Sequence, residues 1–131
     1  ALYFLPLVTA FVYLATIILV GGAYLGIIFA PNHKGMEEIG PDEAESWTQQ
    51  ISSTRNITPS GTIFFLYGGL NYQIEHHLFT SMSRFKLADA RVLVREFCKD
   101  KGITYHEVPW PETISELYDA LKREAKRSFV N

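Results

Sequence analysis

The first charged side chain in this sequence is Lys34, and the uncharged stretch before it strongly limits how the chain can fold. From Leu2 to Pro31 most residues are Leu, Ile, Val, Phe, Ala, Tyr or Gly, whereas all 12 Lys and Arg and all 14 Asp and Glu come later. The stretch exceeds the roughly 20 apolar residues that a helix needs to cross a bilayer. Pro6 lies near its start, where a missing N–H costs least. We therefore expect a membrane-spanning helix from about Pro6 to Ala30.

A secretory signal and a buried helix are the competing interpretations of this stretch. The apolar run is too long for a signal, and no basic residue precedes it. Gly21, Gly22 and Gly26 form a side of small residues that another membrane helix could approach closely. The chain begins at Ala1 without a start methionine, almost inside the expected helix, so we expect it to be a fragment of a longer protein.

The charged residues indicate which partners and which compartment to expect. The net charge of −2 gives no surface suited to a polyanion, so we expect no nucleic-acid partner. The single cysteine, Cys98, excludes an internal disulfide framework and Cys-based zinc sites, and it fits a reducing compartment. Lys34 and Arg55 are the basic residues nearest the expected span. The positive-inside bias therefore places the region after Asn32 in the cytoplasm.

After the span, the sequence predicts helices joined by short irregular segments. We expect a short helix in residues 41–53 and an interfacial helix from Thr62 that continues into the histidine-rich segment. An amphipathic helix is expected from Lys86 to Lys101, ended by Gly102. An extended segment from Ile103 to Val108 should follow, and then a last helix with a capping box at Thr113-Ile114-Ser115-Glu116. The expected fold class is all-α. It is a membrane helical fragment with one transmembrane helix and a cytosolic helical cap over about residues 31–131.

The segment Gln73-Ile74-Glu75-His76-His77 carries the chemistry. On a helix, Gln73, His76 and His77 lie at i, i+3 and i+4 and share a face. Adjacent histidines differ by about 100° around the helix axis, which suits two neighbouring metals better than one. Neutral imidazole binds iron, zinc or copper, and Gln73 could orient a ring from outside the ligand set. Taken alone, the dipeptide also fits a chance pair on an interfacial helix.

The longer string GGLNYQIEHHLF, from Gly68 to Phe79, resembles the third histidine box, Gln-x-x-His-His, of membrane fatty-acid desaturases. The Gln form is typical of the front-end desaturases and of related bacterial acyl-CoA desaturases. The flanks agree, because segments 29–36, 53–56 and 93–107 are similar to the family's segments at the corresponding places. The resemblance therefore covers nearly the whole chain, as the single C-terminal part of a desaturase domain over residues 1–131.

The resemblance implies roles for five residues. His76 and His77 match the box histidines and would be iron ligands. His33 matches a position whose histidine ligates metal in this superfamily, while Asn32 and Gln73 would support the site from outside the ligand set. His106 is expected at the surface, and Glu75 is expected to be structural or solvated.

The resemblance also implies the reaction. Two iron ions would activate O₂, electrons would arrive from a reductase, ferredoxin or b-type cytochrome, and a double bond would form in a fatty acyl-CoA or acyl-lipid as O₂ is reduced to water. The membrane lipid is a further partner. The family's first and second histidine boxes are absent here, so the upstream part of the same enzyme is expected to supply them. The fragment alone is expected to be inactive.

Two positions depart from the family pattern, and two alternatives stay open. The family usually has proline at the positions of Thr80 and Ser83 in this chain. This difference puts the full activity of the site in doubt. A sphingolipid desaturase or lipid hydroxylase with the same di-iron site is one alternative function. A small single-span membrane protein, whose His pair binds a metal or haem without catalysis, is the other.

Overall fold

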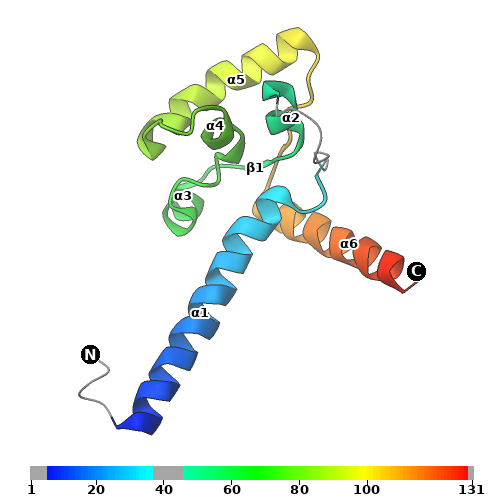
Figure 1. Cartoon of the computed structure of the whole chain (residues 1–131). Helices are drawn as coiled ribbons and strands as arrows, with labels where there is room; N and C mark the ends of the chain where they lie inside the picture. The colour runs from blue at the N-terminus through cyan, green and yellow to red at the C-terminus, as the bar shows by residue number, and fades with distance from the viewer. Residues whose placement is uncertain (1–5, 37–45, 130–131) are drawn as a thin grey trace.

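The computed structural model describes residues 6–36 and 46–129 (Figure 1). In chain order the elements are α1 (Leu7–His33), α2 (Trp47–Ser52), β1 (Asn56–Ile57), α3 (Gly61–Tyr67), α4 (Gln73–Leu78), the 3₁₀ helix η2 (Arg84–Lys86), α5 (Leu87–Lys101), β2 (Glu107–Val108) and α6 (Trp110–Ser128). The predicted all-α class is confirmed. Within the described residues, the strands are limited to the short parallel pair β1 and β2, with Asn56 opposite Glu107 and Ile57 opposite Val108.

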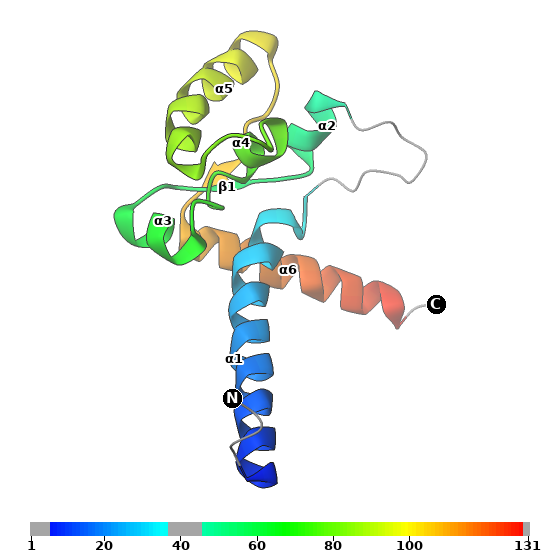
Figure 2. The same cartoon turned by 60° about the vertical axis from the view of Figure 1, so that its left-hand side comes forward.

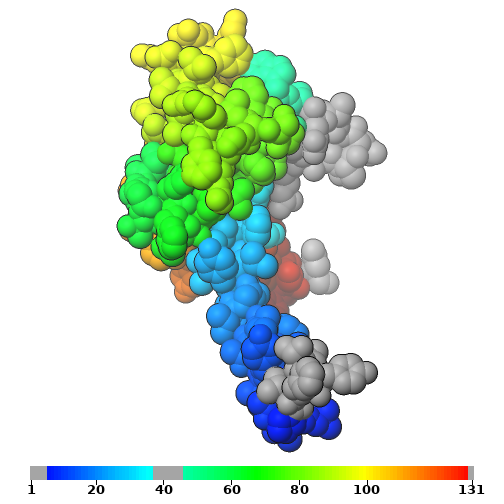
Figure 3. All heavy atoms as spheres, turned by 90° about the vertical axis from the view of Figure 1, so that its left-hand side faces the viewer, coloured from blue at the N-terminus to red at the C-terminus, as the bar shows by residue number. Residues whose placement is uncertain are grey.

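Helix α1 extends away from the rest of the molecule as a long apolar rod (Figure 3). Its 27 residues reach about 40 Å at 1.5 Å per residue, enough to cross a bilayer core of about 30 Å. Apolar side chains along it are open, for example Phe11 at 70% and Leu19 at 72% exposure. The helix predicted over residues 6–30 is thus present, and it continues to His33. It has the length and composition of a membrane span.

Pro31, inside the last turns of α1, frees a backbone carbonyl that helix α3 then uses. A proline has no N–H, so the carbonyl of Ile27, four residues earlier, loses its helical donor. The hydroxyl of Tyr67, the last residue of α3, donates to that carbonyl at 3.3 Å. Tyr24 also donates to the carbonyl of Leu66 at 2.5 Å. Helix α3 is therefore anchored on the C-terminal third of α1.

The core is built where short elements meet beyond the end of α1. One cluster joins α2, α4 and α5 through the buried side chains Ile51, Ile74, Val94 and Cys98. A second cluster, of Ile28, Ile57 and Tyr67, joins α1, β1 and α3. Helix α4, which carries the histidine pair, is thus fixed between the two clusters and close to the last turns of α1.

The prediction of one helix from Thr62 into the histidine segment is wrong, because two helices form there. Gly68 ends α3 in the left-handed region with φ 60°, and Gly69 has φ 92°. Glycine adopts such angles without the Cβ penalty that other residues pay. A side chain at Gly69 would also meet Cβ of Arg84 at 2.9 Å. The break redirects the chain, so α4 takes its own orientation and does not continue α3.

The start of α6 also differs from the prediction, whereas α5 agrees with it. Helix α5 covers Leu87–Lys101 and ends at Gly102, in the left-handed region as expected. Helix α6 begins three residues before the predicted capping box, with Pro109 as N-cap and Pro111 in its first turn. Proline is well suited to that turn. The Thr113 hydroxyl donates to the Pro109 carbonyl at 3.1 Å, so Thr113 lies within the helix and does not cap it.

Helix α2 begins later than the sequence predicted. It starts at Trp47 with a capping box in which the Ser46 hydroxyl accepts from Gln49 N and the Gln49 side chain accepts from Ser46 N. The predicted start, in residues 41–45, lies outside the described residues. Ile51 enters the core as expected for an apolar position on this helix.

Ser83, at one of the two positions where the resemblance predicts proline, already has a proline-like backbone. Its φ is −59° and its ψ 133°, close to the φ of about −65° that the proline ring imposes. We expect Ser83→Pro to stabilise the protein by about 0.4–1 kcal/mol, because the ring restricts the unfolded chain more than the folded one. Thermal unfolding in detergent measures this. A loss of stability would mean that Met82 cannot take the conformation required before proline.

Candidate metal site

The structure brings His33, the last residue of α1, beside the histidine pair of α4. The ring centroids of His33 and His77 are 5.2 Å apart at an interplanar angle of 68°, and those of His76 and His77 are 6.1 Å apart. His33 is exposed and the pair in α4 is half-buried. Local helix geometry does not require this closeness, since 44 residues separate His33 from His77.

The side-chain amide of Gln73 joins the two histidines. Its Nε2 lies 3.2 Å from Nε2 of His33 and 3.0 Å from Nε2 of His77. Gln73 is the first residue of α4 and His77 follows four residues later, so the predicted shared face of the helix is present. Gln73 itself is buried at 3% exposure, which restricts its amide to a narrow position.

Asn32 determines which way round the Gln73 amide lies. The Asn32 Nδ2 donates to the carbonyl of Leu70 at 2.9 Å, and a carbonyl can only accept. The same Nδ2 donates to Oε1 of Gln73 at 3.2 Å. The network therefore assigns Nε2, a donor, to the end of the Gln73 side chain that faces the histidines.

This assignment gives the tautomer of both imidazoles as they lie beside Gln73. Because the Gln73 Nε2 can only donate, Nε2 of His33 and Nε2 of His77 are both acceptors, with the proton on Nδ1. Two unprotonated Nε2 atoms thus face the same small region. An unprotonated imidazole nitrogen is the form that binds iron and other transition metals.

The histidine nitrogens are donor atoms of the kind that bind iron, but the described residues do not form a complete metal site. Within residues 6–36 and 46–129, no group of three or more His, Cys, Asp or Glu lies close enough to hold a metal ion. Beside the histidines, Oδ1 of Asn32 is buried and has no partner within the described part of the chain. A complete coordination sphere needs further ligands in addition to His33, His76 and His77.

His106 lies apart from this group. It lies in the extended segment directly before β2, and its Nε2 is 3.0 Å from Oε2 of Glu116. The side chain is 31% exposed, so His106 lies at the surface as expected, although it has a partner there. Its partner Glu116 also pairs with Arg55, whose side chain is fully buried and also donates to the carbonyl of Lys34. Burial lowers the pKa of Arg55, and Glu116 partly opposes this.

Glu75, expected to be structural or solvated, is fully buried and structural. Its two oxygens accept from Nδ2 of Asn56 and from the hydroxyl of Tyr105, each at 2.7 Å. Asn56 is oriented by the backbone N–H of Ile74, which donates to its Oδ1 at 2.9 Å. Burial raises the pKa of Glu75, although both hydrogen bonds lower it. No spacing in the sequence indicates this network, because its members lie in α4, β1 and the segment before β2.

Comparison with known proteins gives the family of this chain. The family model described as fatty acid desaturase matches residues 1–109. The chain therefore belongs to the fatty acid desaturase family. The match with the family model ends at residue 109, one residue before α6 begins.

Three relatives show how much of such a protein this chain represents. It is 39% identical to an acyl-lipid (9-3)-desaturase of Physcomitrium patens over 128 residues, 96% of this chain and 24% of that protein. It is 40% identical to the delta(5) fatty acid desaturase fat-4 of Caenorhabditis elegans over 108 residues, 79% of this chain and 24% of that protein. It is 54% identical to the delta(6)-fatty-acid desaturase fat-3 of the same organism over 56 residues, 43% of this chain and 13% of that protein. The chain thus spans a quarter or less of these relatives, and no solved structure matches it.

Proposed function

We propose that this chain is the C-terminal part of a di-iron, O₂-dependent fatty-acid desaturase that inserts a double bond into a long acyl chain carried by CoA or by a lipid. The observation that carries the proposal is the convergence of His33 and His77 on the amide of Gln73, from elements 40 residues apart in sequence. Family membership supplies the reaction class.

In this proposal His33, His76 and His77 hold iron, and the upstream part of the enzyme completes the coordination. Bound iron supplies the oxidising power from O₂ that no side chain has, which removal of hydrogen from an unactivated acyl chain requires. The chain's own contribution is positional. Asn32 holds Gln73, and Gln73 donates to Nε2 of His33 and to Nε2 of His77, so it brings the two rings together. A ring that ligated iron through Nε2 would give up its contact with Gln73, because that nitrogen has a single lone pair.

The position of the site relative to α1 suits an amphiphilic substrate. We infer that α1 crosses the membrane and that residues after Asn32 are cytoplasmic, because the first basic residue follows the end of the span. The histidines then lie at the boundary between membrane and cytosol. An acyl chain can reach this boundary from the bilayer, while its polar carrier and the electron donor approach from the cytosol.

Iron content tests the proposal. In the full-length protein, we expect His33→Ala to lower the iron bound per chain, measured by elemental analysis of the purified protein, because one imidazole ligand is lost. His106→Ala is the matched control, since His106 lies outside the cluster and pairs with Glu116. Full iron content in folded His33→Ala protein would remove His33 from the site.

A further inference from the structure

Helix α6 is docked by one face against the cytosolic end of α1. The docked residues are spaced three or four apart along the helix: Thr113, Glu116, Ala120 and Glu124. Glu116 pairs with the buried Arg55, and Oε1 of Glu124 lies 3.2 Å from Nζ of Lys34. A Cβ added at Gly35 would lie 3.0 Å from that of Ala120, so the helix approaches the backbone there closely.

A second face of α6 is apolar and open. It consists of Ile114, Tyr118, Leu121 and Ala125, followed by the C-cap residue Phe129. Tyr118 is 58%, Leu121 48% and Phe129 90% exposed. At about 100° per residue, the centre of this stripe is turned by roughly 135° from the centre of the docked face. Most of the charged side chains lie on the side opposite the stripe.

The start of α6 lies at the level of the uncharged part of α1. The indole Nε1 of Trp110 donates to the hydroxyl of Tyr67 at 3.0 Å, and that hydroxyl donates to the carbonyl of Ile27. The apolar groove here has a volume of about 390 Å³, and it is lined by Tyr24, Ile27, Ile28, Ile63, Leu66, Tyr67 and Trp110. Along α6, contacts with α1 then move from Ile27 to Lys34, the first charged residue after the span.

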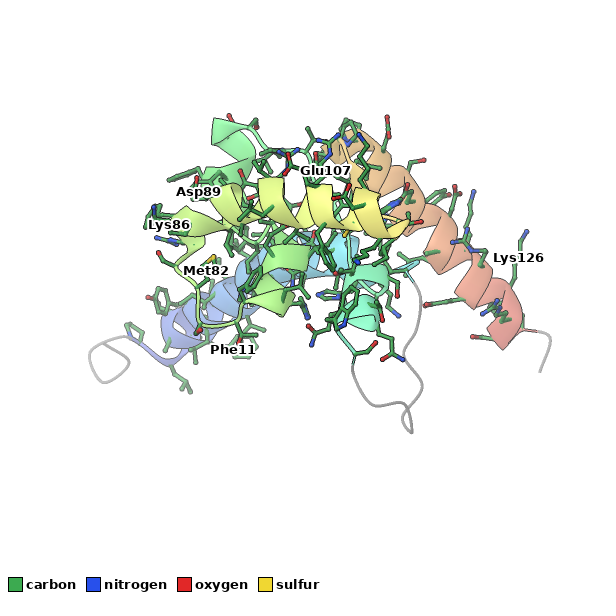
Figure 4. All side chains as sticks on the ribbon, turned by 90° about the horizontal axis from the view of Figure 1, so that it is seen from above. Phe11, Met82, Lys86, Asp89, Glu107 and Lys126 are labelled. Carbon is green, nitrogen blue, oxygen red and sulfur yellow. The ribbon has the colours of Figure 1, made fainter. Side chains whose placement is uncertain are left out.

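The direction of α6 completes the geometry. Figures 1 and 2 show α6 running crosswise to α1 and outward from its end. In the view from above in Figure 4, Lys126 lies on the outer part of α6, away from helices α1 to α5. If α1 crosses the bilayer, a helix with this direction at this level lies parallel to the membrane surface.

Two lysines in the outer half of α6 border the apolar stripe. At about 100° per residue, Lys122 and Lys126 lie roughly 60° and 100° from the centre of the stripe, whereas Arg123 and Arg127 lie on the side opposite it. The acidic side chain of this part, Glu124, is paired with Lys34. Lys122 lies next to the stripe, with its Nζ 4.2 Å from the centre of the Tyr118 ring. Lysines at the border of an apolar face can extend toward headgroups while their stems cover apolar surface.

We propose that α6 is an interfacial helix, with its apolar stripe in the outer hydrocarbon and headgroup layer of the bilayer and with Lys122 and Lys126, beside the stripe, on anionic lipid headgroups. This proposal rests on the membrane placement of α1 in the proposed function. Helix α6 follows the region that the family model matches, whereas the alignment over 128 residues with the Physcomitrium patens desaturase includes most of it.

Spin labels on opposite sides of α6 test the proposal. In the full-length protein, with Cys98→Ala and any other accessible cysteine replaced, a nitroxide is attached at Leu121→Cys on the stripe or at Asp119→Cys on the charged side. The protein is reconstituted into vesicles of equal phosphatidylcholine and phosphatidylserine. We expect the ratio of accessibility to O₂ over accessibility to a water-soluble nickel chelate to be severalfold higher at position 121 than at position 119.

Three outcomes would overturn the proposal. Equal ratios at the two positions would place α6 in water. A label at position 121 that is immobilised and shielded from both reagents would mean that protein, not lipid, covers the stripe. Unchanged depth at position 121 in vesicles of phosphatidylcholine alone would contradict the role of anionic headgroups. Iron content of the same samples distinguishes these failures from a failure of the metal site, because positions 119 and 121 lie away from the histidines.

Discussion

Cells that express the full-length enzyme with both His76→Ala and His77→Ala are expected to form no measurable unsaturated product from the saturated acyl chain. The two imidazoles are adjacent on α4, and His77 shares the Gln73 amide with His33. Without them the site loses two nitrogen ligands at once, and no side chain can replace the oxidising power of the metal. Gas chromatography of the cellular fatty acids measures the loss, alongside iron content of the purified protein.

The loss should be local, because the rings of the pair lie outside both core clusters. His76 and His77 are half-buried, whereas the core of α4 is Ile74, which packs with Ile51 and Val94. Membrane insertion and helix content should therefore match the wild type, and His106→Ala in the same cells should retain product. A double variant that still formed unsaturated chains would contradict the desaturase proposal for these residues.

The parts of the fold that were predictable from the sequence are those with local causes. The uncharged run predicts α1. The amphipathic pattern of residues 86–101, together with Gly102, predicts α5. Neither helical periodicity nor a left-handed glycine needs a distant partner. The predicted extended segment before residue 109 contains β2. The two helices depend on residues within one element, whereas β2 also needs its partner β1.

The errors arise where distant residues decide the conformation. One helix was predicted across the glycine pair 68–69. In the structure α3 ends there, because Arg84 approaches Gly69 closely and the backbone N–H groups of both glycines bond to carbonyls of the last turn. Glu116 matched a capping box, yet its carboxylate pairs with Arg55, 61 residues earlier in the chain. A sequence pattern gives the possible local partner of a side chain, and tertiary structure can offer a stronger one.

The candidate site shows the same division. Gln73 and His77 were predicted to share a face because they lie four residues apart on a helix. The approach of His33, and the part of Asn32 in orienting Gln73 through the Leu70 carbonyl, depend on how α1 packs beside α4. The family resemblance indicated His33 and Asn32, whereas helix periodicity alone had no means of doing so.

Glu75→Leu is expected to destabilise the folded protein by about 2–4 kcal/mol. The substitution keeps a buried side chain of similar size, but it removes the acceptor for both the Tyr105 hydroxyl and the Asn56 amide. Each buried donor left without a partner costs about 1–3 kcal/mol. Asn56 retains its contact with the Tyr105 oxygen at 2.6 Å, which keeps its share of the cost at the lower end.

Glu75→Gln is the matched variant, because its amide keeps the acceptor for Asn56. The amide oxygen can accept from Asn56 and the amide nitrogen can donate to the Tyr105 oxygen, so the Tyr105 hydroxyl hydrogen alone loses its acceptor. Its cost should be about 1–2 kcal/mol, less than that of Glu75→Leu. Thermal unfolding in detergent, followed by circular dichroism, compares the two variants with the wild type. If Glu75→Leu were as stable as Glu75→Gln, the network that joins α4 to β1 and to the segment before β2 would contribute nothing to holding the histidine helix in place.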